Sequence, residues 1–261
     1  MEYALHIKGL EELSQWDNHY SRVYVGSEFC SKLMFSLSEL EEVVSFVRSR
    51  NIGLSIATSY CNESNLPAYK IVIDFIRKKY PDAEIIVNDW GVFNICVACS
   101  VKTVIGRLLV KQKRDPRISD ALDNLPLEAR SRVMDIGLND SILNFLKSKN
   151  IKRIELNNVS QGVNLENIKN NFDFSLHVPF VCVSVTRYCG LEFKNEPNEF
   201  EIKECQAKAC KNIELYNKDL KKLIFRSGNA FFYKNNILPE NIQYSKIDRI
   251  VYDSNLENNQ H

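Results

Sequence analysis

The sequence lacks the features that mark membrane, secreted or polyanion-binding proteins. No apolar run approaches the ~18 to 20 residues that a membrane-spanning helix needs, so we expect no membrane span. The first residues, MEYALHIKGLEEL, contain no basic segment followed by an apolar one, which argues against a signal peptide. The formal net charge is only +1, so the chain has no overall positive field for nucleic acid. We therefore expect a cytoplasmic protein, and its charge does not favour RNA as a partner.

Several well-known catalytic and nucleotide-binding motifs are also missing. The chain has no glycine-rich dinucleotide loop, P-loop, HExxH or Ser–His–Asp order. It does have 8 cysteines. In a reducing cytoplasm these are expected to be core thiols, metal ligands or catalytic groups, not a disulfide framework.

What the sequence does contain is an alternation of short β-rich segments and helical patterns, which is typical of βαβ units. We predict strands at residues 3–7, 22–25, 53–58, 83–87, 103–108, 153–156, 174–177 and 180–185. Helices are predicted at 36–50, 67–79, 92–99 and 141–149. Eight strands in a chain near the ~250 residues typical of the fold favour an α/β protein with a TIM-like (β/α) barrel. The barrel is expected to be irregular or incomplete, because no helix separates the last two strands.

The whole chain divides into three predicted parts. Residues 1–210 form the barrel and a cysteine-rich final loop. Residues 211–254 form a small C-terminal β appendage with strands at 223–233 and 247–252, and residues 255–261 form a disordered tail.

Four cysteines follow predicted strands and are candidate metal ligands. Cys30 comes shortly after the second strand, and Cys189, Cys205 and Cys210 lie in the polar loop after the eighth. Residues that follow strands meet at one end of a barrel. Four thiolates suit zinc or an iron–sulfur cluster, and the wide spacing favours a 4Fe-4S cluster over a structural zinc site, because only two of them lie close together in the sequence. Alternatively, they are unconnected loop thiols.

The other cysteines are interpreted as structural. Cys96 and Cys99 form a C-x2-C pair, but their surroundings, FNICVACS, are apolar and predict a buried helix. Cys182 lies inside a strand, and Cys61 also carries no ligand pattern.

Polar residues at the strand ends are candidates for binding a substrate. Asn88 and Asp89 follow the fourth strand and could instead cap a helix. Glu155 would face the barrel interior and would then need a partner, for which Arg107, Lys111 and Arg187 are candidates; an internal ion pair is the plain alternative. His177 could act as a general acid or base, or be a structural histidine. The candidate substrate-binding set is Asn88, Asp89, Arg107, Glu155, His177 and Arg187.

A basic run follows the fifth strand. It consists of Lys111, Lys113, Arg114 and Arg117. It could hold an anionic ligand or an RNA phosphate, or simply be a solvated loop.

Six stretches, taken in order, resemble the U32 peptidase family of collagenase-like proteins. They are RVYVG, EIIVNDWGVF, GRLLVKQKRDPR, RIELNN, SLHVPFVCVSVTRYC and RSGNAFFYKN. The resemblance covers nearly the whole chain, from about residue 22 to residue 253. The resemblance implies a TIM-like barrel and, as in several members, a four-iron cluster held by four cysteines. The family's Glu, His-Gly and paired-cysteine signature is missing, so peptidase activity is not expected.

The cysteine arrangement is most similar to the cluster-bearing UbiV-type branch. That branch has one early cysteine and three after the last barrel strand, an order that Cys30, Cys189, Cys205 and Cys210 match. The resemblance implies a subunit of a system for oxygen-independent hydroxylation or related modification, with a second U32-type chain as partner and a small aromatic or nucleobase substrate. A non-catalytic partner with a structural four-cysteine metal site, or a U32-type peptidase, is the alternative.

Overall fold

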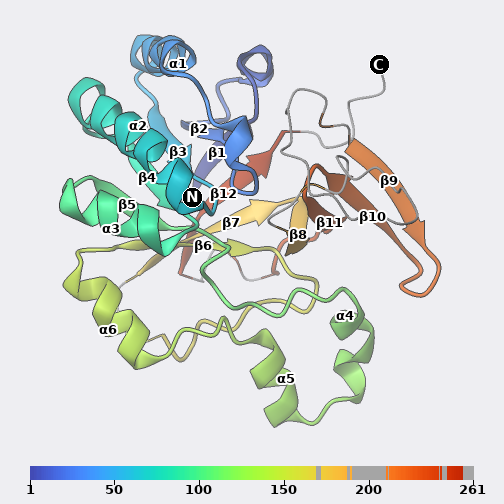
Figure 1. The fold of residues 1–261 in the computed structure, drawn as a ribbon. Coiled ribbons are helices and arrows are strands. Elements are labelled where there is room, and N and C mark those ends of the chain that lie inside the picture. The colour runs from blue at the N-terminus through green and yellow to red at the C-terminus, as the bar shows by residue number, and fades with distance from the viewer. Residues whose placement is uncertain are drawn as a thin grey trace, which may run out of the picture.

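The computed structural model describes residues 1–168, 172–186, 189, 210, 212–240, 242 and 246–254. Within this part of the chain, eight parallel strands close into a barrel in the order β1-β12-β7-β6-β5-β4-β3-β2 (Figure 1). The barrel strands are β1 (Glu2–Ile7), β2 (Arg22–Gly26), β3 (Gly53–Ala57), β4 (Glu84–Val87), β5 (Lys102–Ile105), β6 (Arg153–Asn157), β7 (Asp173–Val178) and β12 (Ile247–Asp253). The predicted TIM-like barrel is confirmed.

Helices cover the outside of the barrel (Figure 1). The longer ones are α1 (Leu37–Arg50), α2 (Leu66–Lys79), α3 (Trp90–Ala98) and α6 (Asp140–Ser148). Two shorter helices, α4 (Arg117–Ala121) and α5 (Leu127–Met134), lie in the connection between β5 and β6. Single turns occur at η1 (Leu10–Gln15), η2 (Ser31–Leu33), η3 (Glu63–Asn65) and η4 (Leu122–Asn124). None of the helices in the described ranges is long and apolar enough to span a bilayer.

Local sequence signals account for where helix α1 begins and ends. The Ser36 hydroxyl accepts from the Glu39 backbone N–H, and the Glu39 carboxylate accepts from the Ser36 N–H at 2.7 Å, which makes a capping box. Asn51 ends the helix in the left-handed conformation. The apolar residues Leu40, Val43, Val44 and Val47 share one face and are buried against the barrel.

A second, antiparallel sheet is formed by β8 (Phe180–Val185), β11 (Ala230–Lys234), β10 (Lys222–Ser227) and β9 (Asn212–Asn217), in that order. One of its faces packs on the loops that follow β2 and β5, where Phe180 and Phe232 meet Phe29 and Leu108. The small sheet therefore lies over the end of the barrel at which the strands finish. The segment 223–233, predicted as one strand, is a hairpin that turns at Gly228, whose φ is +57°.

The strand prediction was wrong in a second place. Residues 180–185 were expected to be the eighth barrel strand, but β8 belongs to the small sheet, and β12, expected in the appendage, closes the barrel between β7 and β1. The reason is the connection between β7 and β8, which is a single residue. A parallel neighbour needs a crossover of about a dozen residues or more. The connection from β8 to β12, which contains the rest of the small sheet, is long enough for such a crossover. The strand that pairs with β7 in the barrel is therefore β12.

Alternate residues of the barrel strands face the interior, and their register places them in layers. Glu2, Ala4 and His6 of β1 lie opposite Arg249, Val251 and Asp253 of β12. The middle layer is apolar, with Ala4, Tyr24, Ala57, Ile86, Val104 and Val251 in one buried cluster. The layers above and below it are charged. The residues between them in sequence, such as Leu5 and Ile7, pack outward against the helices.

The layer at the N-terminal ends of the strands is an ion-pair network centred on Arg249, which is 2% exposed. Its guanidinium donates to Glu84 at 2.7 Å and to Glu2 at 2.5 Å, and Arg22 lies 3.4 Å from Glu84. Burial acts to raise the pKa of Glu84, but the two guanidinium groups outweigh it and lower the pKa to about 2. This end of the barrel is therefore held by charges that are paired and hydrogen-bonded.

Substituting Glu84 should weaken the barrel in a pH-dependent way. Because the pKa of Glu84 in the folded chain is below its ordinary value of 4.5, its contribution is present above pH ~4.5 and is lost as the pH falls toward 2. We expect Glu84→Gln to lower the free energy of unfolding by roughly 2 to 3 kcal/mol at pH 7, measured by urea denaturation. The difference from wild type should shrink toward pH 2. Asp82→Asn, which removes an exposed carboxylate paired with Lys102, is the control and should change little. An equal effect of Glu84→Gln at every pH would contradict the ion-pair account.

Candidate functional site

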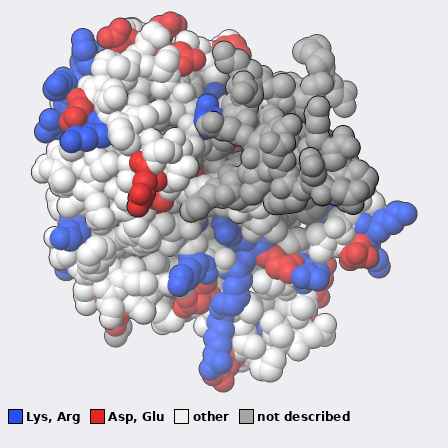
Figure 2. Space-filling view, in the orientation of Figure 1, with Lys and Arg blue, Asp and Glu red and all other residues white. Residues whose placement is uncertain are grey.

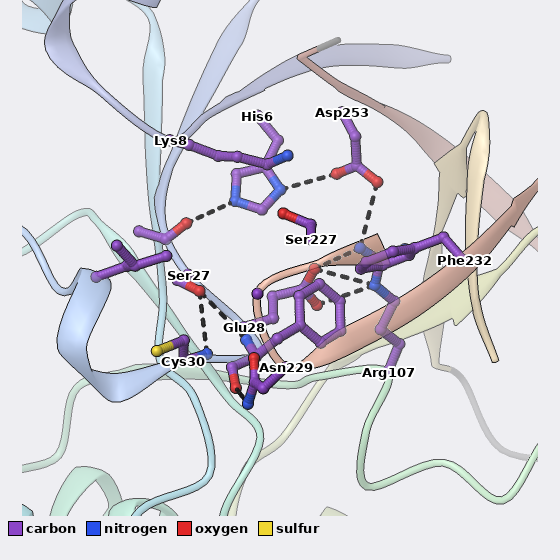
Figure 3. Close-up of a pocket in the computed structure, with 14 residues that line it drawn as sticks. His6, Lys8, Ser27, Glu28, Cys30, Arg107, Ser227, Asn229, Phe232 and Asp253 are labelled. Carbon is purple, nitrogen blue, oxygen red and sulfur yellow. Dashed lines mark hydrogen bonds and ion pairs between the residues drawn. The ribbon is translucent and has the colours of Figure 1, made fainter. Parts of the chain in front are cut away.

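A cavity of about 50 Å³ lies between the barrel mouth and the small sheet (Figure 3). The barrel contributes His6, Lys8, residues 26–30, Leu33, Arg107 and Asp253, and the small sheet contributes residues 227–229 and Phe232. Active sites of TIM barrels lie at this end, where the strands finish. Because about 10 to 15 Å³ is needed to hold one water, the cavity has room for a few waters or one small ion. It is too small for an aromatic ring.

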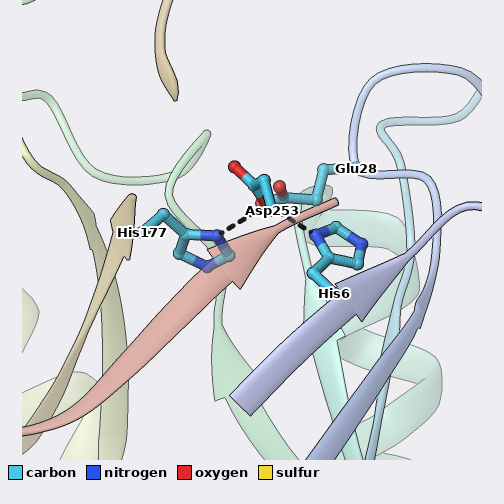
Figure 4. A group of neighbouring side chains, drawn as sticks. All are labelled: His6, Glu28, His177 and Asp253. Carbon is cyan, nitrogen blue, oxygen red and sulfur yellow. Dashed lines mark hydrogen bonds and ion pairs between the residues drawn. The ribbon is translucent and has the colours of Figure 1, made fainter. Parts of the chain in front are cut away.

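His6 connects two neighbouring barrel strands at this mouth. Its Nδ1 lies 2.8 Å from Asp253 Oδ1 (Figure 4). Its Nε2 lies 3.0 Å from the Gly26 carbonyl oxygen. Gly26 has φ +103°, and a Cβ there would lie 2.5 Å from the Ala57 carbonyl oxygen, so only glycine fits. The Gly26 carbonyl, which accepts the hydrogen bond from His6, is thus held in place by a backbone conformation that other residues would not adopt.

His177, predicted as a candidate acid or base, is fully buried next to His6. Its Nε2 lies 2.8 Å from Glu155 Oε2, and its Nδ1 lies 3.5 Å from the same Asp253 Oδ1 that faces His6. Burial acts to lower the pKa of His177, as does the nearby Arg107 guanidinium. The surrounding carboxylates outweigh both and raise the pKa to about 9.

Glu155 faces the barrel interior, as expected, but its partners are not those expected. Instead of Arg107, Lys111 or Arg187, the described partners are His177 and the Tyr24 hydroxyl, which donates to Glu155 Oε1 at 2.9 Å. Arg187 lies outside the described residues. Arg107 is bound instead to Glu28 and Asp253.

Arg107 is 1% exposed and binds two other carboxylates. Its Nε lies 3.0 Å from both oxygens of Glu28, its Nη2 lies 2.5 Å from Glu28 Oε2, and the same Nη2 lies 3.2 Å from Asp253 Oδ2. Its Nη1 donates to the Phe180 carbonyl of the small sheet at 3.1 Å. Burial acts to raise the pKa of both carboxyls, but Arg107 holds the pKa of Glu28 below its usual value and that of Asp253 well below it. Arg107 thus joins the barrel mouth to the sheet that covers it.

Two of the four candidate cluster ligands lie near the cavity. Cys30 lines it directly. Gly228 also lines it, and a Cβ on Gly228 would lie 3.7 Å from Cys210 Sγ. Cys189 is half-buried, and Cys205 lies outside the described residues. Convergence of all four thiols therefore stays a prediction.

The remaining cysteines have the surroundings of core thiols. Cys96 is buried in α3 and Cys182 in β8, where burial raises their pKa to about 12 and about 11. Cys99 packs on the core from the end of α3. Cys61 donates to Asp89 at 3.6 Å, and burial raises its pKa to about 12.

Asn88 and Asp89 hold backbone at the end of β4. The Asn88 side chain donates to the Thr58 carbonyl at 2.9 Å and accepts from the Leu108 N–H at 3.0 Å. Asp89 caps α3 by accepting from the N–H groups of Gly91 and Val92, which is the alternative foreseen from the sequence. Neither lines the cavity, and substrate binding by either stays a prediction.

The basic run after β5 is engaged with its surroundings. Arg117 forms an exposed ion pair with Asp115, and Lys113 donates to the Arg132 carbonyl at 2.8 Å. Arg114 Nη1 is buried and has no hydrogen-bond partner among the described residues. On the face drawn in Figure 2, basic and acidic side chains are interspersed, so the surface there shows no preference for a polyanion.

Four residues of the site were not predicted from the sequence: His6, Glu28, Tyr24 and Asp253. For His6, the period-two alternation of a strand was a usable signal. His6 is the last of the inward-facing residues Glu2, Ala4 and His6, in an otherwise apolar strand. Asp253 was missed because its strand was assigned to the appendage. Glu28 lies in a loop, where no periodicity marks it.

Comparisons with known proteins give a structural likeness but no sequence match. The sequence matches no family model and no curated protein. Among solved structures, the U32 peptidase Mk0906 is similar, with 8% sequence identity and a TM-score of 0.47 over 98% of this chain and 93% of that chain. A likeness at this level does not show family membership.

Replacing Arg107 should destabilise the barrel mouth strongly. Arg107→Met would leave Glu28 and Asp253 buried without their guanidinium partner. We expect the free energy of unfolding to fall by roughly 3 to 5 kcal/mol, measured by urea denaturation. Arg132→Met, which removes an exposed arginine paired with Glu128, is the matched control and should behave like wild type. Equal stability of the two variants would show that Arg107 does not hold the mouth together.

Proposed function

We propose that this chain is an iron–sulfur protein of the U32 type that takes part in oxygen-independent hydroxylation or a related modification of a ring or nucleobase. It would act as an enzyme subunit, with a second U32-type chain as partner. Two observations support this: the order of the cysteines in the sequence and the position of Asn229 in the structure.

Asn229 connects the segments that carry three of the four cysteines. Its Nδ2 lies 2.7 Å from the carbonyl oxygen of Phe29 and 2.7 Å from that of Thr186. Phe29 precedes Cys30, Thr186 is three residues before Cys189, and Asn229 follows Gly228, which neighbours Cys210 Sγ. Segments distant in the sequence are therefore tied to one another by a side chain that is 5% exposed. This supports a shared site for the three thiols.

The donor set suits a 4Fe-4S cluster better than one ion. The group of His, Cys, Asp and Glu ligand atoms within 4.8 Å of one another, among the described residues, contains no cysteine. The four thiolates of a cluster bind different irons and are therefore farther apart than the ligands of one ion. Cys30, Cys189, Cys205 and Cys210 would hold the cluster. When bound, it would supply or relay electrons to the substrate.

The chain's own polar residues would then serve the site in two ways. His177 contacts Glu155 and Asp253, and Arg107 contacts Asp253, so the three substrate-set residues belong to one buried network that can hold protons near the cavity. Asn88 and Asp89 fix the loop after β4, and Arg187 belongs to the proposed substrate set by its position in the sequence. Because this cavity is too small for a ring, the substrate would bind at the rim next to Cys30, or in a second cavity of about 370 Å³ that Asp253 also lines.

A non-catalytic partner protein is the second candidate, and the small sheet gives it some support. Tyr216 and Leu223 lie opposite each other on β9 and β10 and are both exposed, at 62% and 49%. An exposed apolar pair of this kind is suited to contact with another chain. Zinc in place of iron would fit this candidate, with the four cysteines as a structural site. A U32-type peptidase is disfavoured by the missing sequence signature and by the small cavity.

Anaerobic metal analysis tests the cluster. We expect about four iron atoms and about four acid-labile sulfides per chain, with the visible absorption of an iron–sulfur cluster. Cys30→Ser and Cys210→Ser should lose iron and sulfide together, because each removes a proposed ligand. Cys99→Ser, a substitution at the end of α3, is the control and should retain both.

Three results would count against the proposal. Wild-type protein with neither iron nor sulfide would remove the cluster. Zinc alone would favour the structural site and the partner candidate. Iron retained at the wild-type level in both Cys30→Ser and Cys210→Ser would show that the cluster has other ligands.

A further inference from the structure

Two histidines and two carboxylates converge at the barrel mouth, separate from the proposed cluster ligands. One ligand atom from each of His6, Glu28, His177 and Asp253 lies within 4.8 Å of all the others (Figure 4). They come from the ends of β1, β7 and β12 and from the loop after β2, and no residue of the group is more than slightly exposed.

The hydrogen bonds of His6 fix which ring nitrogen carries its proton. Nε2 lies 3.0 Å from the Gly26 carbonyl oxygen, and a carbonyl can only accept. The Nε2 of His6 therefore carries hydrogen. In the neutral ring, the Nδ1 atom then presents a lone pair to Asp253 Oδ1 at 2.8 Å.

The same reasoning applies to His177. Its Nε2 lies 2.8 Å from Glu155 Oε2, a buried carboxylate that also accepts from Tyr24. Nε2 is therefore a donor. Because the pKa of His177 is raised, its Nδ1 carries a proton toward the same Asp253 Oδ1 at 3.5 Å when no metal is bound, and a metal ion would replace that proton and take the lone pair. Two imidazole nitrogens and a carboxylate oxygen thus point at one another, an arrangement that needs either protons or a cation between them.

This is the geometry of metal-binding histidines. Such a histidine almost always donates its second ring N–H to a backbone carbonyl or a carboxylate, which fixes the ring and makes the other nitrogen a better ligand. Both kinds of acceptor occur here. His6 Nε2 donates to the Gly26 carbonyl, and His177 Nε2 donates to the Glu155 carboxylate. The carboxylates are supported as well, because Arg107 holds Asp253 by Oδ2 and leaves Oδ1 facing the rings.

Distance and charge also suit a divalent ion. Zinc ligands of this type lie about 2.0 to 2.2 Å from the metal, so two of them are at most ~4.4 Å apart, and the 2.8 and 3.5 Å separations from Asp253 are within that limit. With neutral rings, the carboxylates of Glu28, Glu155 and Asp253 outnumber the Arg107 guanidinium by two charges. Lys8 also lines the cavity, and its charge interacts with those of Asp253 and Glu28, so it offsets one of the two excess negative charges. A divalent ion would more than balance the remaining one.

We propose that His6, Glu28, His177 and Asp253 bind one divalent transition-metal ion at the mouth of the barrel. Mixed imidazole and carboxylate ligands suit Zn²⁺, Fe²⁺ or Mn²⁺, whereas Ca²⁺ and Mg²⁺ prefer oxygen ligands alone. The adjoining cavity of about 50 Å³ leaves room for water or a small ligand on the ion, as catalytic metal sites require. The site is independent of the proposed cluster, with which it shares no ligand.

The test is metal titration of the full chain after chelation, in a Cys30→Ser and Cys210→Ser background so that these thiols do not compete. Co²⁺ reports its ligands by visible absorption, and Zn²⁺ affinity follows by competition. We expect one ion per chain, with the d–d bands of nitrogen and oxygen ligands and no thiolate charge-transfer band. His6→Gln and His177→Gln should each weaken binding at least about 100-fold, and Glu155→Gln about 10- to 100-fold through the support it gives His177.

Controls separate binding from folding. His19→Gln, which removes an exposed histidine, should bind like wild type. Each variant is checked for a cooperative thermal transition, and His6→Gln keeps an amide that can donate to Gly26. If His6→Gln fails to fold, His177→Gln and Glu155→Gln provide the comparison. Two results would overturn the site: no binding of Co²⁺ or Zn²⁺ when all four ligands are intact in the cysteine-substituted background, or unchanged affinity in the folded variants. The ring nitrogens would then carry protons in place of a metal ion. A four-iron cluster found or missing in the earlier experiment would not alter this result.

Discussion

The insertion of β12 between β1 and β7 is the constraint on which the barrel mouth depends. This pairing places Asp253 at the register position of His6 and beside His177, so that one carboxylate oxygen faces two imidazole rings. The same strand brings Arg249 to the opposite end of the barrel, where it pairs with Glu2 and Glu84. A single strand from the end of the chain thus completes both charged layers.

The two charged layers are connected through the barrel interior. Arg249 donates to the Tyr24 hydroxyl at 2.7 Å, and Tyr24 donates to Glu155, which is bound to His177. Burying charge is costly unless each group is paired and hydrogen-bonded, and here each has at least one partner. A network of this kind favours one arrangement of strands over others, because any slip in register would leave a buried charge alone. It also delivers its groups in fixed orientations, as a binding or catalytic site needs.

The candidate site was only partly predictable. His177, Glu155 and Arg107 were recognised because polar residues near strand ends stand out in apolar segments, but their partners were not. The expected Glu155–Arg107 pair does not occur, since the layer that each residue occupies depends on the stagger of strands around the barrel. Glu28 carried no local signal, because loop residues have no periodicity. The burial of Cys96 and Cys182 was predicted from their immediate neighbours, and the cap formed by Asp89 is one of the two roles that the sequence left open for it.

The sequence by itself determined the local elements: the helices with their caps, the strands with their apolar outward faces, and the barrel class that follows from their alternation. Tertiary structure alone decided which strand closes the barrel, which segments cover its mouth, and which ionisable groups meet there. The physical reason is that strand periodicity and capping act over a few residues, whereas closure and charge pairing join residues as distant as His6 and Asp253. Such pairs are selected by the packing of the whole barrel, and no local pattern records them.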